Sequence, residues 1–289
     1  MRAAARMEIS MTIDGSAKML PGCEWDSQGA AGLVCAQRGL VYSLMQKCLR
    51  YSALMITFLL VSSLHGQETC DEEVKLLLVP AEVKVAIPAL QARGETHGRV
   101  YFYDTPALDL LSNGVVLRLR ERAEIDLTAK LRPLSDKTYV DPSGGRERYK
   151  CEVDLNNGVE VKSFSVEREY ADAKVPETGT EVFQLLSAGQ KKLLEDSQVA
   201  IDWSRVRRVA DIQSTTWKTD AKPDLGKLSV ELWEWPGGSA LEVSTKVAPA
   251  AGQSTYSGLK VLAKKEGLAL SRDQRSKTAI ALKAIIAAH

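Results

Sequence analysis

The chain has 289 residues, of which 45% are hydrophobic and 26% are charged. This is the composition of a globular protein, and the length allows one large domain or two small ones. The formal net charge is only +1, so no overall field favours binding to nucleic acid. The three histidines lie far apart in the sequence, at positions 65, 97 and 289, which disfavours a His-rich zinc site.

The N-terminal part has the layout of a leader. Residues 1–44 show no sustained hydrophobic period, and we interpret them as disordered or as lying upstream of the true start at Met45. After Met45, two basic residues precede the apolar run 52–64, which is typical of a secretory signal peptide over residues 45–66. The run is short for a transmembrane helix, and a signal anchor that stays attached is the alternative. We therefore expect an exported chain, periplasmic or extracellular, with one mature domain over residues 67–289 and no stable membrane anchor.

Five cysteines stand at positions 23, 35, 48, 70 and 151, and none forms a C-x-x-C pair. Zinc and thioredoxin-like sites therefore have no support. Only Cys70 and Cys151 follow the apolar run. In an exported chain these two could form a disulfide, and two unpaired thiols are the alternative that the sequence leaves open.

Strand and helix patterns follow one another through the mature domain. Strands are predicted over residues 71–79, 100–103, 115–122, 127–132, 147–155, 205–217, 227–235 and 239–247, where apolar residues alternate with polar ones or where β-branched and aromatic residues gather. Helices are predicted over residues 81–93 with an interruption at Pro88, over a short piece ending at Leu111, over 181–195 and 256–266, and from Ser271 to about Ala288. Residues 133–146 read as a loop, and Asn157-Gly158 predicts a hairpin turn.

The charged faces of these strands differ in the sign of their charge along the chain. Side chains alternate between the two faces of a strand, so charged residues spaced by two share one face. An antiparallel sheet with one face in water produces the same alternation. A closed antiparallel barrel with a charged lumen better explains why the central strands are basic and the outer ones acidic. The basic positions are Arg118, Arg120, Lys130, Arg132, Arg148 and Lys150, and the acidic ones are Glu73, Glu231 and Glu242.

This series of motifs resembles the CYTH superfamily, also called triphosphate tunnel metalloenzymes. The strand YFYDTP at residues 101–106 is followed by G-x-x-L-R-x-R at 114–120. The family's E-x-E-x-K motif reads DEEVK at residues 71–75, with Asp71 in place of the first Glu. Further matches are the basic K-L-R strand at Lys130 and Arg132, the late acidic strand at Glu231, the C-terminal E-x-E strand at Glu242 and the S-K pair at Ser276 and Lys277. The resemblance covers about residues 71–280 and implies an α+β fold, an antiparallel β-barrel tunnel with flanking helices.

The resemblance also implies an activity, the metal-dependent hydrolysis of a triphosphate, either inorganic or on an organic carrier. It assigns Mg²⁺, or Mn²⁺, as the cofactor, because hard cations take oxygen ligands and bridge phosphate oxygens. The implied metal ligands are Glu73, Glu231, Glu242, Asp71 and Glu152. The implied catalytic residues are Lys75, Arg118, Arg120 and Lys130, and the implied substrate-binding residues are Arg132, Arg148, Lys150, Lys218, Lys246 and Lys277. For each of them the alternative is a salt bridge in the barrel wall.

Two departures from the family pattern weaken the expectation of catalysis more than that of the fold. Ser244 replaces the second acid of the E-x-E strand, and Thr216 stands where a further phosphate-binding Arg is expected. A binding protein that captures polyphosphate or a phosphorylated ligand in the same tunnel is therefore an alternative function. An adenylate cyclase is a third, although cytosolic ATP does not suit an exported chain. No nucleic-acid partner is expected.

Overall fold

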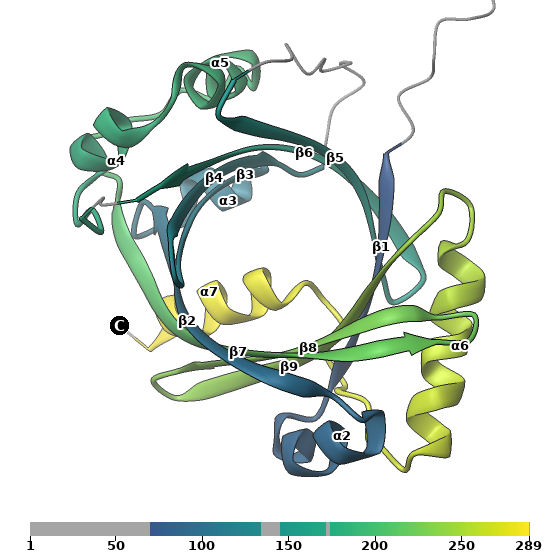
Figure 1. Ribbon diagram of the computed structural model, residues 1–289. Coiled ribbons are helices and arrows are strands. Elements are labelled where there is room, and N and C mark those ends of the chain that lie inside the picture. The colour runs from purple at the N-terminus through teal and green to yellow at the C-terminus, as the bar shows by residue number, and fades with distance from the viewer. Residues whose placement is uncertain (1–69, 134–144, 172–173, 289) are drawn as a thin grey trace, which may run out of the picture. The chain divides into compact units, whose positions relative to one another are not determined.

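The computed structural model describes residues 70–133, 145–171 and 174–288 (Figure 1). They belong to the second of two compact units, Gln67–His289. The predicted leader, and most of the loop predicted at residues 133–146, lie outside the described residues. Within the described part, no helix is long and apolar enough to cross a membrane.

Nine strands close into a barrel in the order β1-β5-β6-β4-β3-β2-β7-β8-β9 (Figure 1). This confirms the predicted fold class, with one difference. β1 pairs antiparallel with β9 but parallel with β5, so the barrel is not antiparallel throughout. The strands are β1 Asp71–Leu78, β2 Arg93–Asp104, β3 Val115–Glu121, β4 Ile125–Leu131, β5 Glu147–Asn156, β6 Val159–Tyr170, β7 Arg207–Lys222, β8 Gly226–Trp235 and β9 Gly238–Val247.

The strand predictions were most accurate where the alternation was regular. β2 begins at Arg93, well before the predicted start at Val100. The prediction missed the first half of the strand because these residues are polar and exposed. β6 is the return strand of the hairpin predicted at Asn157-Gly158, where both residues have positive φ, 50° and 75°. β7 has a register shift against β2 between Phe102 and Tyr103, and another against β8 between Lys218 and Ala221.

The helices differ more from their predicted bounds. They are η1 Pro80–Glu82, α2 Val83–Leu90, α3 Asp109–Ser112, α4 Gly179–Leu185, α5 Ala188–Asp196, α6 Gly252–Lys265 and α7 Lys277–Ala287. Pro88 lies inside α2, and the helix ends at the left-handed Gln91 (φ 57°), so Gly94 is already part of β2. The helix predicted over residues 181–195 is two helices, because Ser187 caps α5 with a capping box that includes Gln190.

The start predicted for the last helix at Ser271 was wrong. α7 begins six residues later, with Ser276 as its N-cap, whose hydroxyl accepts a bond from the backbone N–H of Ala279. Gln274, whose capping-box spacing to Ser271 was the reason for that predicted start, has another role. Its amide pairs with the backbone of Leu77, donating to the carbonyl at 2.7 Å and accepting from the N–H at 3.0 Å. Gln274 therefore ties the segment before α7 to β1.

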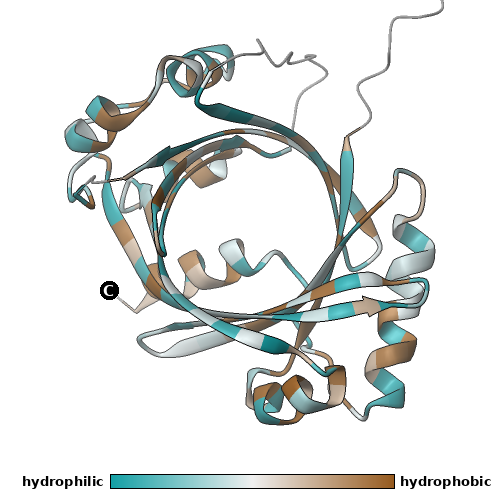
Figure 2. Cartoon of the chain, viewed as in Figure 1, coloured by the Kyte–Doolittle hydropathy of each residue, from teal (hydrophilic) through white to brown (hydrophobic). Residues whose placement is uncertain are grey.

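Three apolar clusters hold the barrel. One lies under α6 and α2 on the outside of β1, β8 and β9, and a second lies under α4 and α5 on the outside of β3, β4 and β6. Figure 2 shows the corresponding alternation of hydrophilic and hydrophobic residues along the strands. The third cluster joins Leu282 of α7 to Phe102 and Trp233. Trp233 and Glu231 share one face of β8, so this cluster is inside the barrel, and α7 fills that part of its interior.

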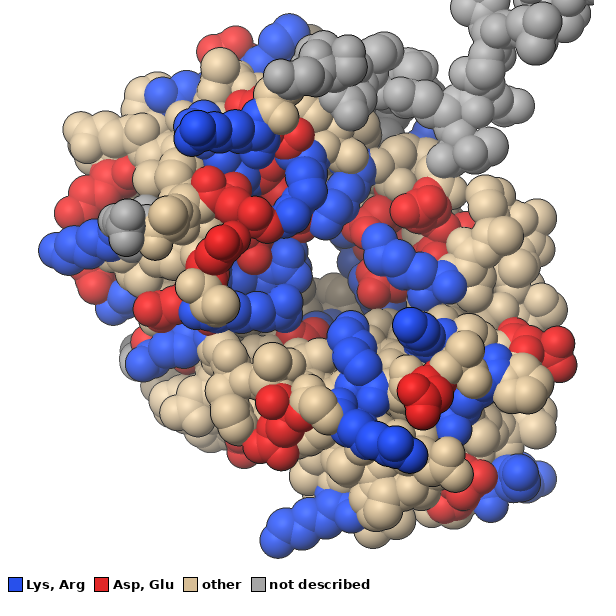
Figure 3. All heavy atoms as spheres, viewed as in Figure 1, with Lys and Arg blue, Asp and Glu red and all other residues tan. Residues whose placement is uncertain are grey.

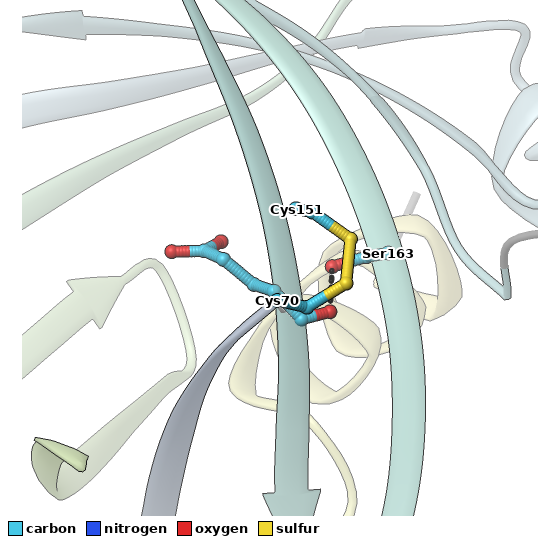
Figure 4. The surroundings of a disulfide bond; sticks show 4 residues. Cys70, Cys151 and Ser163 are labelled. Carbon is cyan, nitrogen blue, oxygen red and sulfur yellow. Dashed lines mark hydrogen bonds between the residues drawn. A yellow bond between two sulfur atoms is a disulfide. The ribbon is translucent and has the colours of Figure 1, made fainter. Parts of the chain in front are cut away.

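A disulfide fastens the parallel seam of the barrel. Cys70, just before β1, is bonded to Cys151 of β5, with 4.6 Å between the Cα atoms (Figure 4). Of the two alternatives left open by the sequence, the structure forms the disulfide. Beside it, the hydroxyl of Ser163 donates a hydrogen bond to the backbone carbonyl of Glu152 at 3.3 Å. The seam between β1 and β5 is thus held by covalent and strand contacts together.

Candidate functional site

The inward faces of the strands enclose a tunnel. Its main cavity has a volume of about 480 Å³, and an adjoining cavity of about 260 Å³ shares Lys75, Arg118 and Lys277 with it. Ten Lys and Arg side chains line the main cavity against five Glu side chains. Figure 3 shows a hollow at the centre of the barrel with basic and acidic side chains around it. The tunnel therefore has a local excess of positive charge in a protein whose net charge is close to zero.

Most of the residues implied by the resemblance lie in this tunnel. The main cavity is lined by Glu73, Lys75, Arg118, Arg120, Lys130, Lys150, Glu152, Lys218, Glu231, Glu242, Lys246 and Lys277, and the adjoining one also by Arg132. Two residues line neither cavity. Arg148 has a side chain 51% exposed and pairs with Glu169 at 2.6 Å. Asp71 has a side chain 72% exposed and lies 4.0 Å from Lys246. They belong to the rim of the barrel.

The cations that line the two cavities from β1, β3, β4 and β5, together with Arg132 just after β4, form what we call the basic wall. It consists of Lys75, Arg118, Arg120, Lys130, Arg132 and Lys150. These side chains gather around two buried carboxylates. Asp154 of β5 accepts from Lys75 and lies 3.4 Å from the Lys130 ammonium and 3.2 Å from the Arg132 guanidinium. Glu167 of β6 pairs with Lys150 at 2.5 Å, with Arg120 at 3.3 Å and with Arg148 at 3.4 Å.

The two central carboxylates were not among the predicted site residues. Asp154 shares a strand face with Arg148 and Lys150, but nothing in the sequence marks it as different from them. Glu167 lies in β6, which the sequence predicted only as the return of a hairpin. The alternation of Ser163, Ser165 and Glu167 with apolar residues was the available signal. Its meaning depends on which strand lies beside β6, and that is not local information.

Burial and ion pairing set the charge of these groups. Burial alone would raise the pKa of Asp154, but Lys75, Lys130 and Arg132 hold it well below its usual range. The pKa of Glu152 is likewise lowered to about 2, against the effect of burial, by Lys130 and Lys246. Burial would lower the pKa of Lys75, but Glu73 and Asp154 outweigh it and the pKa is raised. Asp154, Glu152 and Lys75 therefore keep their charges across the neutral pH range.

Among the described residues, Arg118 is the cation of the basic wall with the longest ion pair. Its guanidinium lies 3.4 Å from the Thr128 hydroxyl and 3.8 Å from the Glu167 carboxylate, and its buried Nε has no hydrogen-bond partner among the described residues. Burial and the adjacent Arg120 lower the pKa of Arg118, yet an arginine remains charged at neutral pH. A buried donor without a partner is costly, so this geometry favours a ligand that accepts hydrogen bonds.

On the opposite side lie Glu231 of β8 and Glu242 of β9, which we call the acidic pair. They face each other directly in the strand register. The ammonium of Lys277, the first residue of α7, bonds to Glu231 and lies 3.0 Å from Glu242. It also lies 4.5 Å from the centre of the Trp233 ring. Although burial would lower it, the pKa of Lys277 is raised by both carboxylates, and Lys277 in turn lowers the pKa of Glu231.

The carboxylates implied as metal ligands do not form a metal site in this arrangement. Among the described residues, no group of three His, Cys, Asp or Glu side chains is placed to hold a metal ion. Glu73 pairs with Lys75 at 3.0 Å, and Glu152 pairs with Lys130 at 3.2 Å. With Lys277 between the acidic pair, each of these carboxylates is paired with a lysine.

The two departures noted in the sequence both lie in the tunnel wall. Ser244 of β9 lies opposite Lys75 in the register and lines the main cavity, where a second acid would have added a negative charge. Thr216 of β7 lies opposite Glu231, and its backbone carbonyl accepts a hydrogen bond from the Thr96 hydroxyl at 3.1 Å. Both positions are therefore neutral parts of the lining.

Comparison with known proteins gives the fold. Neither a protein-family model nor a curated protein sequence matches the chain. A protein from Hippeastrum, assigned as an adenylyl cyclase and described as having a dominant triphosphatase activity, is 19% identical with a TM-score of 0.52, over 73% of this chain and 95% of that one. A Bacillus halodurans protein provisionally assigned as an adenylate cyclase is 14% identical with a TM-score of 0.48, over 73% and 97% of the two chains.

At these identities the likeness is informative about the fold and not about the activity. The Hippeastrum structure matches nearly along its whole length, and the closed nine-stranded barrel of the described residues agrees with it. The resemblance stated from the sequence is thus confirmed at the level of the fold. The described residues share their barrel fold with the Hippeastrum protein.

Proposed function

We propose that the tunnel binds the triphosphate group of an inorganic or organic triphosphate and hydrolyses one of its phosphoanhydride bonds. The observation that carries the proposal is the excess of Lys and Arg over Glu in the main cavity, with the buried Nε of Arg118 lacking a partner among the described residues. A triphosphate carries several negative charges and many acceptor oxygens. Guanidinium and ammonium groups in fixed positions offset its repulsion and bind those oxygens.

The basic wall would supply most of the contacts to the triphosphate. Phosphoryl transfer depends mainly on positioning and on stabilising the charge of the transferred group. Asp154 and Glu167 hold their cations in place before the ligand arrives, so little reorganisation is needed on binding. Arg118 has hydrogen-bonding capacity to spare, and we assign it to the transferred phosphoryl group.

The attacking water needs a group that accepts its proton. Five carboxylates line the main cavity. The pKa values of Glu152, Glu167 and Glu231 are all lowered, against burial, by neighbouring lysines and arginines, which makes these groups weak bases. Among the described residues, the side chain of Glu73 pairs only with Lys75, and it lines the same cavity. We therefore assign the proton-accepting role to Glu73.

The tunnel lining bears on both the metal and the kind of substrate. Mg²⁺ or Mn²⁺ is implied by the resemblance, but the donor groups in the tunnel do not fit a preformed site, so no step of the proposed reaction passes through a metal. The adjoining cavity has apolar side chains, Leu111 and Val116, next to Arg132. It would accept an organic carrier, while the main cavity alone would accept the inorganic ion.

The first test is phosphate release from inorganic triphosphate and from ATP by the purified chain, with Mg²⁺, with Mn²⁺ and with a chelator. Release that is lost in Glu73→Ala and Arg118→Ala, both folded, supports the proposal. Release that persists in both variants would remove the site assignment. A cyclic product from ATP would instead identify a cyclase.

Capture of a phosphate ligand without turnover is the second candidate. The neutral positions Ser244 and Thr216, and the lysine between the acidic pair, favour it. Under this function, triphosphate raises the thermal stability of the chain and no phosphate is released. We also propose that the chain works outside the cytosol, because the Cys70–Cys151 disulfide suits an oxidising compartment.

A further inference from the structure

We propose that the ammonium of Lys277 is the resident cation of the acidic pair and keeps a divalent metal ion out of that position. The inference depends on the proposed function only in taking the tunnel as the ligand site. The resemblance implies that Glu231 and Glu242 bind a metal ion. In this chain their partner is the Lys277 ammonium instead, and the inference follows from this difference.

The Lys277 ammonium occupies the position between Glu231 and Glu242 that a metal ion bound by these two carboxylates would need. Glu231 and Glu242 lie opposite each other on β8 and β9, so their side chains are close together on the inward face. The Lys277 ammonium bonds to Glu231 and lies 3.0 Å from an oxygen of Glu242. A cation bound between these two carboxylates would have to displace it. An ammonium supplies up to three donors, and two of them are directed here at carboxylate oxygens.

Lys277 is held there by the fold and is not a mobile surface lysine. Only 8% of the residue is exposed. It is the first residue of α7, whose Ser276 cap fixes the start of the helix. Further along, Ala281, Leu282 and Ile285 anchor α7 in the apolar cluster inside the barrel. The Trp233 ring, 4.5 Å from the ammonium, adds an attractive cation–π contact.

The number of carboxylates around Lys277 suits a monovalent cation between them. Ser244 takes the place of the other acid of the E-x-E strand, which leaves two carboxylates on this side, Glu231 and Glu242, where a third would favour a divalent ion. Across the tunnel the cations already outnumber the carboxylates, so an anionic ligand can be neutralised by the chain itself.

The test is a titration of the full chain with Mn²⁺ alone, without phosphate, in which free Mn²⁺ is measured by its EPR signal. The variants are Lys277→Met, which keeps the length of the side chain and removes the charge, and the matched control Lys283→Met, an exposed lysine on the same helix. We expect Lys277→Met to gain one Mn²⁺ site per chain with at least 100-fold tighter binding than wild type. The gain is expected to be absent in Lys283→Met and lost again in Lys277→Met/Glu231→Gln.

Two results would overturn the proposal. One is Lys277→Met binding Mn²⁺ no more tightly than Lys283→Met. The other is one tight site in the wild type that Glu231→Gln or Glu242→Gln removes. This second comparison needs no change at Lys277, so it decides the question even if Lys277→Met does not fold. Because no triphosphate is present, failure here is distinct from failure of the proposed hydrolysis.

Discussion

The basic wall and the acidic pair line the same tunnel, but their charges are arranged in opposite ways. In the basic wall, one carboxylate stands at the centre of several cations, as Asp154 does among Lys75, Lys130 and Arg132. In the acidic pair, one cation stands between two carboxylates. The first arrangement leaves positive charge over for a ligand. The second leaves a surplus of one negative charge, so the two sides of the tunnel cannot have the same role.

The largest expected effect concerns the seam that joins the two sides. The double variant Cys70→Ser/Cys151→Ser removes a cross-link between residues 81 positions apart. Loop-closure entropy predicts a loss of about 4 kcal/mol in the free energy of unfolding. Urea unfolding measures it, and reductant should bring the wild type to the value of the variant. Equal stability of the two proteins would mean that strand pairing alone holds the seam.

The second prediction tests whether the basic wall is organised around its carboxylates. Asp154 is fully buried, and Asp154→Asn leaves three cations without their shared partner. Breaking a buried ion pair from one side should lower the free energy of unfolding by about 3 kcal/mol. The control is Glu195→Gln, an exposed acid on α5, which should change it by less than about 0.5 kcal/mol. A loss no larger than that of the control would contradict the central role of Asp154.

The third prediction concerns the excess charge. Arg118→Ala should weaken triphosphate binding about 100-fold, which corresponds to about 2.7 kcal/mol, because it removes the cation that has bonds to spare. Isothermal titration with triphosphate in the presence of chelator measures the affinity. Arg99→Ala is the matched control, since Arg99 is half exposed and pairs with Asp211. A similar loss in both variants would show a general effect of net charge and not a site.

The fourth prediction is a pH dependence at the point where the two sides meet. Glu152 of β5 bonds to Lys130 of the basic wall and to Lys246 of β9. Its pKa is about 2 in the folded chain, below the value of about 4.3 in an unfolded one. Its stabilising effect is therefore fully present above pH 4.3 and is lost as the pH falls towards 2.

Replacing Glu152 by Gln should accordingly lower the free energy of unfolding at pH 7 by an amount on the order of 2 kcal/mol. The difference from wild type should shrink as the pH falls through this window. Urea unfolding at a series of pH values measures both. A difference that stays constant with pH would show that the effect of the substitution is not electrostatic.

The smallest effect is expected at the rim. The side chain of Lys246 is 54% exposed, and exposed ion pairs are worth at most about 1 kcal/mol. Lys246→Ala should weaken triphosphate binding no more than about 5-fold, and the effect should vanish at high salt because exposed charges are screened. A loss as large as that of Arg118→Ala would move the binding site from the centre of the tunnel to its mouth.

The sequence predicted the faces of the strands well because alternation is a local property. Arg118 and Arg120 had to share a face, as did Glu73 and Lys75, whatever lay beside them. The barrel itself also follows from the alternation together with the resemblance. The same local logic failed for α7, since the spacing of Ser271 and Gln274 matched a capping box while the Gln274 amide bonded to β1 instead.

Partnerships between strands could not be predicted in this way. The grouping of cations around Asp154 and Glu167 depends on which strands are neighbours and in which register they pair. The parallel pair of β1 and β5 has no local signature at all. Nor does the position of Lys277, which depends on how α7 enters the barrel. These features of the structure could not be predicted from the sequence motifs.

The parallel pair has a further consequence, for the order of folding. β1 is the first strand of the described chain, but its neighbours are β5 and β9, so Glu72 must find both Val153 and Val247. Contacts between residues so distant in sequence form slowly, because a long loop must close before they contribute any stability. Hairpins such as β5–β6 and β8–β9 close short loops, so we expect them to form before β1 pairs with its two neighbours. The barrel is closed only when both of these pairs have formed, so we expect the charges that line the tunnel to come together late in folding.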